Sequence, residues 1–456
     1  MRKTTLLLPL ALFACTPTTS NPPGPDGGGS SVDLDRLVAG GDCPSAQGAG
    51  VDHATDITAD ETWRAADGPH RVTRNVRVLA TLTVEPCATV LVSDGVRIDV
   101  GAAPKAGKLI ALGTASGGLK PVRFMAADAG KPWGAIVLDS TGAAELSVTA
   151  LIDGASPAAA QNGGGALRAY GVSPKSTEDP AITASLKAND LLVERPGDLG
   201  VNLQRYAGFA PGSTHVAVRG AKQAPLRLEL AAAGTLPKVT LSGNARDEIE
   251  LDSSANIPTT TIPKAGAPYR VLRALVIGSA VDGQVATLTV QSGVTLRFDD
   301  ATNDSGITLG ASPTRQGVIV AKGTASEPIT FTSAKDAPAP GDWAGLYFRD
   351  TPTSGNAIEN AVIEYGGAPS GAQGYGCGDA ANDASILLFE RPADAFVRNV
   401  RFRRGAGDTG IVLGWKSDED GPDFKATNTF EEMPTCAVSH WRRMDGSCPN
   451  GQPECL

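Results

Sequence analysis

The feature that most constrains the fold is an internal repeat of short segments in which apolar and polar residues alternate. Ala80–Val84 recurs as Ala286–Val290 with the same five residues. Gly107–Ser116 is similar to Gly317–Ser326, and both contain the run Gly-Thr-Ala-Ser. A long internal repeat is typical of solenoids, in which each unit buries its apolar face against the next.

Two further pairs of segments match in the same order, namely Trp133–Leu138 with Trp343–Phe348 and Leu192–Asp198 with Leu388–Asp394. The offset between the copies is 210 residues at Gly113 and Gly323 (323 − 113) and 196 at Glu194 and Glu390 (390 − 194). We interpret the copies as two units that keep their strand order and differ by loop insertions.

The alternation also predicts which side chains point inward. Lys108 lies in the first copy and Lys322 in the second, and both must face water. Successive side chains of a strand point to opposite faces, so Leu109, Ala111, Ile319 and Ala321 should be buried. The inward set is aliphatic, which indicates a tube of stacked coils around one apolar interior.

Several motifs resemble those of the right-handed parallel β-helix repeat proteins, which include bacterial lipoproteins. The resemblance rests on Thr-Leu-Thr-Val, Gly-Thr-Ala-Ser, Pro328–Ser333, Gly341-Asp-Trp343 and Ala361–Gly367. It implies an all-β solenoid of two degenerate units, 42–250 and 251–433, with a Cys-rich cap at 434–456. We expect roughly a dozen or more coils, each rising about 4.8 Å. Pectate lyases and polygalacturonases share this architecture, so an enzyme must be considered.

The first fifteen residues predict an export signal. Arg2 and Lys3 precede a short apolar stretch from Leu6 to Phe13. The stretch ends in Leu-Phe-Ala-Cys15, which resembles the lipobox of bacterial lipoproteins and implies a lipid on Cys15. Thr16 follows the cysteine, which favours the outer membrane or cell surface. The alternative is a plain secretory signal with an incidental cysteine.

Residues 16–41 are expected to form a tether between this anchor and the body. Thr16 to Ser31 contains mainly Pro, Thr, Ser, Asn and Gly, a composition that cannot form a core. A coil of this length reaches on the order of 20 Å.

Six cysteines remain if Cys15 is lipidated, and an even number in an exported chain indicates disulfides. Metal binding is the alternative, although the cysteines contain no Cys-x-x-Cys pair. We predict that one disulfide closes the N-terminal end and that two hold a tail without strand alternation over the last coil. The predicted pairs are Cys43–Cys87, Cys377–Cys436 and Cys448–Cys455.

Composition and motifs favour binding over catalysis. The net charge of −9 argues against nucleic acid or an anionic membrane surface as the main partner. Asp299-Asp300 and Arg97-Ile-Asp99 resemble fragments of the hydrolase motifs, but in the wrong order and without their histidine. We therefore expect a lipid-anchored, non-enzymatic surface that binds glycans or a surface protein. A polysaccharide lyase or hydrolase acting on acidic glycans and a structural envelope spacer are the alternatives.

Few residues suggest a specific site. Asp418, Asp420 and Asp423 resemble the first half of a calcium loop whose closing glutamate is absent, so a solvated turn without cofactor is preferred. Arg398, Arg401 and Arg403 alternate with apolar residues and should share one outward face, where they either bind acidic sugars or only solvate the sheet. Trp133 and Trp343 could stack on sugars, but their equivalent positions favour a structural role.

Overall fold

The computed structural model describes residues 32–45, 49–157, 164–253, 257–299, 305–369, 383–406, 409–416, 420–433, 436–442 and 454–456. The chain divides into two units, Met1–Ser31 and Val32–Leu456. All described residues belong to the second unit, which we call the body. Cys15 and the residues of the predicted signal lie outside the described residues.

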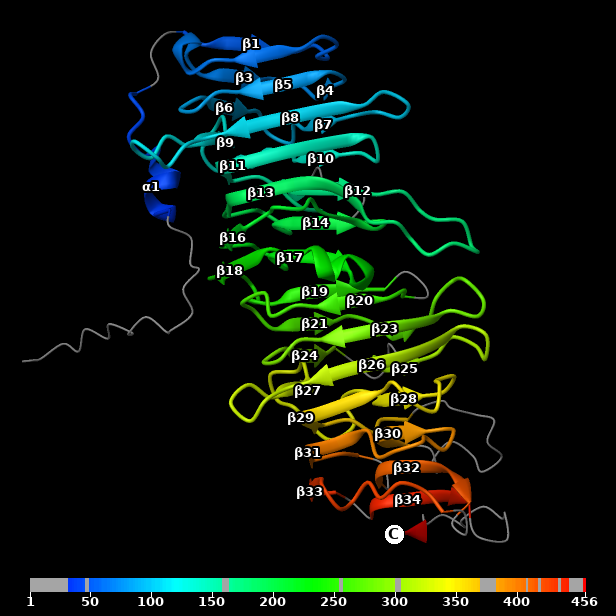
Figure 1. Cartoon of the computed structure of the whole chain (residues 1–456). Coiled ribbons are helices and arrows are strands. Elements are labelled where there is room, and N and C mark those ends of the chain that lie inside the picture. Colours follow the sequence, from blue (N-terminus) through cyan, green and yellow to red (C-terminus); the bar gives the residue numbers. More distant parts are fainter. Residues whose placement is uncertain are drawn as a thin grey trace, which may run out of the picture. The chain divides into compact units, whose positions relative to one another are not determined.

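The body is a stack of coils (Figure 1), and the pairing of its strands places them on four sides. Side 1 contains β2 (Glu61–Trp63), β5 (Thr81–Val84), β8 (Gly107–Leu112), the first part of β11 (Gly142–Ile152), the first part of β13 (Thr183–Glu194), β15 (Ala207–Phe209), the 3₁₀ helix η3 (Leu230–Thr235), β20 (Thr260–Ile262), β23 (Val285–Val290), β26 (Gln316–Lys322) and the first parts of β29 (Ala357–Glu364) and β31 (Val397–Arg403). Side 2 contains β1 (Val51–His53), β3 (His70–Val72), β6 (Thr89–Val92), β9 (Val122–Ala126), the second parts of β11 and β13, β16 (His215–Arg219) and β18 (Lys238–Ser242).

Side 3 is the longest continuous ladder. It contains β4 (Val76–Val78), β7 (Ile98–Val100), β10 (Ile136–Leu138), β12 (Leu167–Tyr170), β14 (Val201–Gln204), β17 (Leu226–Glu229), β19 (Ile249–Asp252), β21 (Tyr269–Val271), β24 (Thr295–Phe298), β27 (Ile329–Ser333), the second parts of β29 and β31, and β33 (Thr429–Glu431). Side 4 contains β22 (Leu275–Ile277), β25 (Ile307–Leu309), β28 (Leu346–Phe348), β30 (Ala384–Leu388), β32 (Thr409–Lys416), β34 (Cys436–Arg442) and β35 (Glu454–Cys455). A short 3₁₀ helix, η1 (Ala65–Asp67), follows β2.

Parallel pairing between successive coils confirms the predicted β-helix. Among the described strands, only β34 and β35 pair antiparallel. Leu109, Ala111, Ile319 and Ala321 are fully buried, whereas Lys108 and Lys322 are exposed, as the alternation predicted. On side 3 the inward residues form one apolar column, and the neighbouring outward column is mostly charged or polar. Ion pairs such as Arg227–Glu250, at 2.6 Å, connect adjacent outward residues.

The two units use different sides. Each coil of the first unit passes through sides 1, 2 and 3, whereas each coil of the second passes through sides 1, 3 and 4. The change occurs where β19 pairs with β21 of the next coil. β19 is the last strand of its coil, whereas β21 is followed by β22 on side 4. The Ile257 bridge to Ile277 starts side 4 at this point.

Residues in the left-handed conformation bend the long strands around the first corner. Val148 (φ 46°) divides β11, and Asp190 (φ 51°) divides β13. Asn360 (φ 50°) and Asn399 (φ 54°) do the same in β29 and β31. Asn tolerates this region better than Val, and the Asn360 amide donates to the Gly323 carbonyl oxygen at 3.1 Å. Each bend lets one strand pair on two sides.

The tryptophans have the predicted structural role. Trp133 and Trp343 are fully buried, and each indole N–H donates to the carbonyl of the last residue of a bent strand. The acceptors are Ile152 and Glu364, both at 2.8 Å. Gly154 and Gly366 follow these acceptors and pack against the indole rings, where a Cβ would come within about 3.2 Å.

One of the four sequence matches is wrong in three dimensions. Leu192–Asp198 begins near the end of the second strand of its coil, in β13, whereas Leu388–Asp394 begins at the end of the third strand of its coil, β30. The structural counterpart of Arg195 is Arg404, since both follow the second part of a bent strand and adopt φ near 50°. Similar apolar-to-charged sequences end strands at different positions in the coil, which explains the false match.

The body begins earlier than predicted. Residues 32–41, assigned to the tether, contain α1 (Leu34–Ala39), which Asp33 caps at its N-terminus and Gly40 at its C-terminus. Leu37 is fully buried against outward-facing Ala150, Leu192 and Ala217 of side 2. This N-terminal strap, residues 32–45, therefore covers the outside of the coils.

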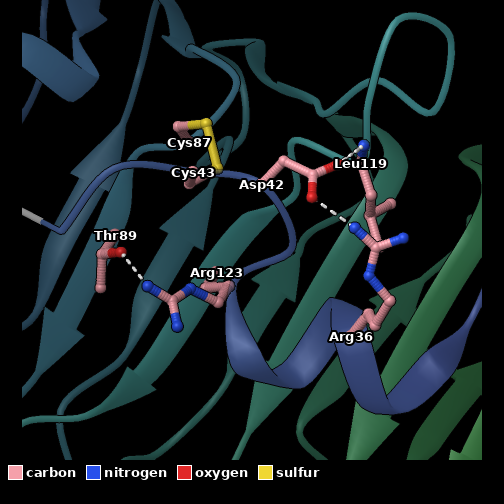
Figure 2. The surroundings of a disulfide bond; sticks show 7 residues. All are labelled: Arg36, Asp42, Cys43, Cys87, Thr89, Leu119 and Arg123. Carbon is pink, nitrogen blue, oxygen red and sulfur yellow. Dashed lines mark hydrogen bonds and ion pairs between the residues drawn. A yellow bond between two sulfur atoms is a disulfide. The ribbon is translucent and has the colours of Figure 1, made fainter.

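The Cys43–Cys87 disulfide is confirmed, but it has a different role from the one predicted (Figure 2). It attaches the end of the strap to the turn before β6 instead of closing the first coil. Asp42 accepts a hydrogen bond from the Leu119 N–H at 2.7 Å and pairs with Arg36. A disulfide of this kind is typically worth about 2–4 kcal/mol.

The predicted C-terminal pairing is wrong. Cys436 bonds to Cys455. The strand that contains Cys455, β35, runs antiparallel to β34, with Ser439 opposite Cys455. The pairs Cys448–Cys455 and Cys377–Cys436 are therefore excluded, and Cys377 and Cys448 lie outside the described residues. Residues 436–442, expected to lack strand structure, extend side 4 by one strand, so the cap starts beyond them.

Candidate functional site

A hollow in the described surface lies at the corner that follows side 2. We call it the corner groove; its volume is about 870 Å³. Its centre is a column of four residues in the left-handed conformation, one from each of four successive coils: Asp153, Arg195, Gly220 and Gly243. The loop 129–132 and the residues after each corner complete the lining.

Missing side chains create the groove. In the second unit the corresponding corner column is Tyr365, Arg404 and Glu432, all with positive φ. There the Arg404 guanidinium donates to the Tyr365 hydroxyl at 2.8 Å and pairs with Glu432 at 3.1 Å, so side chains occupy the corner. In the first unit the column continues with two glycines, and a Cβ on Gly243 would meet no atom within 4 Å.

A chain of ion pairs joins the groove to the N-terminal strap. Arg195 binds both carboxylate oxygens of Asp153, at 2.9 and 3.0 Å, and binds Glu194 at 3.1 Å. Glu194 also binds Arg219 at 2.7 Å, and Arg219 binds Asp35 of α1 at 2.7 Å. The hydrogen bonds that Arg195 donates to the Asp153 carboxylate raise the pKa of Arg195. Burial alone would lower the pKa of Arg219, but Asp35 and Glu194 raise it overall.

The groove is cationic in an acidic protein. Lys131, Arg195 and Lys222 line it, against the single carboxylate of Asp153. Lys131 pairs with Asp128 at 3.3 Å, where both side chains are more than half exposed. In the part of the chain that the structure describes, no carboxylate pairs with the Lys222 ammonium group. The exposed Lys131–Asp128 ion pair contributes little to stability. The ammonium groups of Lys131 and Lys222 can therefore both bind an external anion.

The groove contains no convergent acid–base set. Hydrolysis of a glycoside requires two available carboxyl groups on either side of the bond. Among the described lining residues, Asp153 is the one acid, and Arg195 engages both of its oxygens. The described lining residues also include no histidine. The groove can hold a ligand, and its described lining lacks the carboxyl pair that glycoside hydrolysis requires.

The three predicted arginines do not share a face. Asn399 bends β31, so Arg398 faces outward from side 1, while Arg401 and Arg403 face outward from side 3. Arg401 binds both oxygens of Glu431, at 2.9 and 2.7 Å, and Arg403 pairs with Glu364. Arg398 and Arg401 are three positions apart, so strict alternation could not place them on one face, and Asn399 marks the break.

The calcium candidates are only partly described. Asp418 lies outside the described residues. One carboxylate oxygen of Asp423 accepts from the backbone N–H groups of Lys425 and Ala426, at 2.7 and 3.2 Å, which closes a turn. The Asp420 carbonyl oxygen accepts from Arg391 at 2.6 Å. Within the described ranges, no three carboxylate, imidazole or thiol groups converge as a metal site would require.

Comparison with known proteins identifies one domain. Residues 261–389 match the family model of the pectate-lyase like beta helix domain. Neither a search of curated proteins nor a search of solved structures found a match. The parallel coils and this match agree on the fold. The corner groove, between residues 129 and 245, precedes the matched range.

Proposed function

Because the chain carries a pectate-lyase like beta helix domain, we propose that it is a lipid-anchored envelope or cell-surface protein whose body binds a ligand without catalysis. The corner groove is the observation that carries the proposal, because it is hollow, lies across four coils and has one carboxyl group among its described lining residues. The lipobox-like sequence before Cys15 supports an anchor. Among the described residues, no helix has the length and apolarity needed to cross a membrane.

The anchor is tested by the substitution Cys15→Ser. This change should move the protein from the membrane fraction to the soluble fraction, because a short apolar signal without acylation provides no stable attachment. Fractionation followed by immunoblotting measures the shift. A Cys15→Ser protein found entirely in membranes would refute the anchor.

Binding is tested with a glycan array probed with the full-length Cys15→Ser protein, with calcium and with chelator. Gly243→Tyr serves as the blocked groove, because the second unit already places Tyr365 at a similar φ (63° against 65° for Gly243). Gly212→Tyr is the matched control: Gly212 also has positive φ and open space around it, but it lies outside the groove. Ligands lost only with Gly243→Tyr would support the proposal. Depolymerisation of a uronate polymer at enzymatic rates would overturn the non-catalytic claim.

A further inference from the structure

The position of the corner groove beside the N-terminal strap suggests what binds there. We propose that the groove binds the phosphate-bearing headgroup of a lipid in the membrane to which the chain is tethered. This inference rests on the proposed function, since it requires both the anchor and a binding groove.

The first argument is charge. Asp153 and Glu194 neutralise Arg195, but Lys222 pairs with no carboxylate among the described residues, and the exposed Lys131–Asp128 pair is weak. The corner therefore offers two lysine ammonium groups to an anion, although the net charge of the chain is −9. The Lys131 and Lys222 ammonium groups are exposed, and lysine binds phosphate as a compact point charge.

The second argument is shape. The groove follows the stack across four coils, a length of roughly 15 Å at the usual strand spacing. Its floor consists largely of glycine and alanine, so a ligand can approach the backbone closely. A hollow of about 870 Å³ can accommodate a single headgroup that projects from a bilayer. A flat bilayer surface that only touched this corner would leave the hollow unfilled.

The third argument is the path of the chain. Asp35 of α1 is connected to groove residue Arg195 through Arg219 and Glu194, with each contact at 3.1 Å or less. The predicted tether ends just before Val32, which is buried at the start of the strap. A lipid anchor at Cys15, which the proposed function requires, would hold the body at a membrane whose lipids carry phosphate.

The experiment measures binding of the full-length Cys15→Ser protein to vesicles. One set contains phosphatidylcholine alone, and the other contains phosphatidylcholine with phosphatidylglycerol. We expect tighter binding to the anionic vesicles, and Lys131→Gln and Lys222→Gln should each weaken that preference about fivefold. Gly243→Tyr should abolish most of it.

Matched controls separate the groove from general charge effects. Lys175→Gln removes an exposed lysine that, like Lys131, pairs with an acidic residue three positions away. Lys175→Gln and Gly212→Tyr should leave vesicle binding unchanged, and Gly243→Tyr should melt at the same temperature as Gly212→Tyr.

The remaining outcomes contradict the lipid inference alone or together with the proposed function. If soluble polygalacturonate or a neutral glycan binds in a way that Gly243→Tyr abolishes, while anionic vesicles do not, the lipid inference fails and the proposed function stands. If anionic vesicles bind equally to all variants, the groove is not the lipid site. If Gly243→Tyr affects no ligand on the vesicles or the array, both claims fail.

Discussion

At the scale of single residues, the repeat preserves hydrogen bonds more faithfully than it preserves sequence. Trp133 and Trp343 lie in different sides of the coil, yet each donates to the carbonyl at the end of a bent strand. A buried carbonyl that loses its donor costs more than an average hydrogen bond contributes. The indoles therefore fix the corner geometry of both units.

Trp133→Phe and Trp343→Phe should each lower the free energy of unfolding by about 1–3 kcal/mol, because the Ile152 and Glu364 carbonyls lose their donor. Chemical denaturation followed by circular dichroism measures the change. Trp415→Phe is the control, because the indole of Trp415 donates no hydrogen bond within the described residues. This substitution should lower the free energy of unfolding by less. Equal effects of all three substitutions would contradict the role of these hydrogen bonds.

His53 makes the N-terminal end of the body sensitive to pH. Its ring stacks on Trp63 with centroids 4.1 Å apart and contacts His70 at 3.0 Å. Burial lowers the pKa of His53 below 6.5; nearby His70 acts in the same direction, and Glu61 and Asp52 oppose it. The unfolded chain therefore binds a proton more readily, and stability is lost as pH falls from about 6.5 through the lower folded pKa.

Thermal unfolding between pH 7.5 and pH 5.5 tests this prediction. The melting temperature should fall with pH, and His53→Gln should reduce that slope. Glu61→Gln should steepen it, because the Glu61 carboxylate, 3.4 Å from the His53 ring, favours the charged imidazole. An unchanged slope in His53→Gln would show that other groups control the pH dependence.

At the scale of elements, the N-terminal strap is a separate layer on the coils. A helix of six residues is not stable alone, so α1 is folded only while Leu37 is docked on side 2. Leu37 and Leu109 are equally buried, but Leu37 lies outside the coils and Leu109 faces the interior. Their loss should therefore have different consequences.

Leu37→Ala should open the strap locally and leave the body folded, because undocking does not disturb the coil interior. Limited proteolysis should then cut within residues 32–42, with little change in the melting temperature of the body. Leu109→Ala should instead destabilise the whole body by about 2–5 kcal/mol. If the two variants melt alike, the strap unfolds together with the coils.

The sequence predicted those elements whose determinants are local. Alternation predicted the inward phase of Leu109 and Ile319, because every coil of a parallel stack repeats the same inward column. The signals of α1, the Asp33 cap and Gly40, were present but lay beside a polar tether. Whether a strand lies on side 2 or side 4 depends on the neighbouring coil with which it pairs. The corner groove depends on side chains missing at Gly220 and Gly243, which only stacked corners reveal.

At the scale of the whole body, three sides are in use in any one coil, and the choice changes along the stack. Sides 1 and 3 continue through both units, side 2 ends at β18, and side 4 begins near β22. The interior nevertheless forms one cluster of buried residues that spans both units. Continuity of the core therefore does not require the two units to be exact structural copies.

The change from side 2 to side 4 gives the duplicated surfaces different azimuths about the stack axis. The corner after β13 and its counterpart after β31 arise from equivalent segments, yet they open in different directions. If Gly220 and Gly243 had counterparts in the second unit, the resulting groove would not extend the first in a straight line. A straight, rigid polymer could occupy only one of the two, and engaging both would require a ligand that winds around the body. Duplication in this solenoid thus diversifies the directions in which sites point instead of lengthening a single binding track.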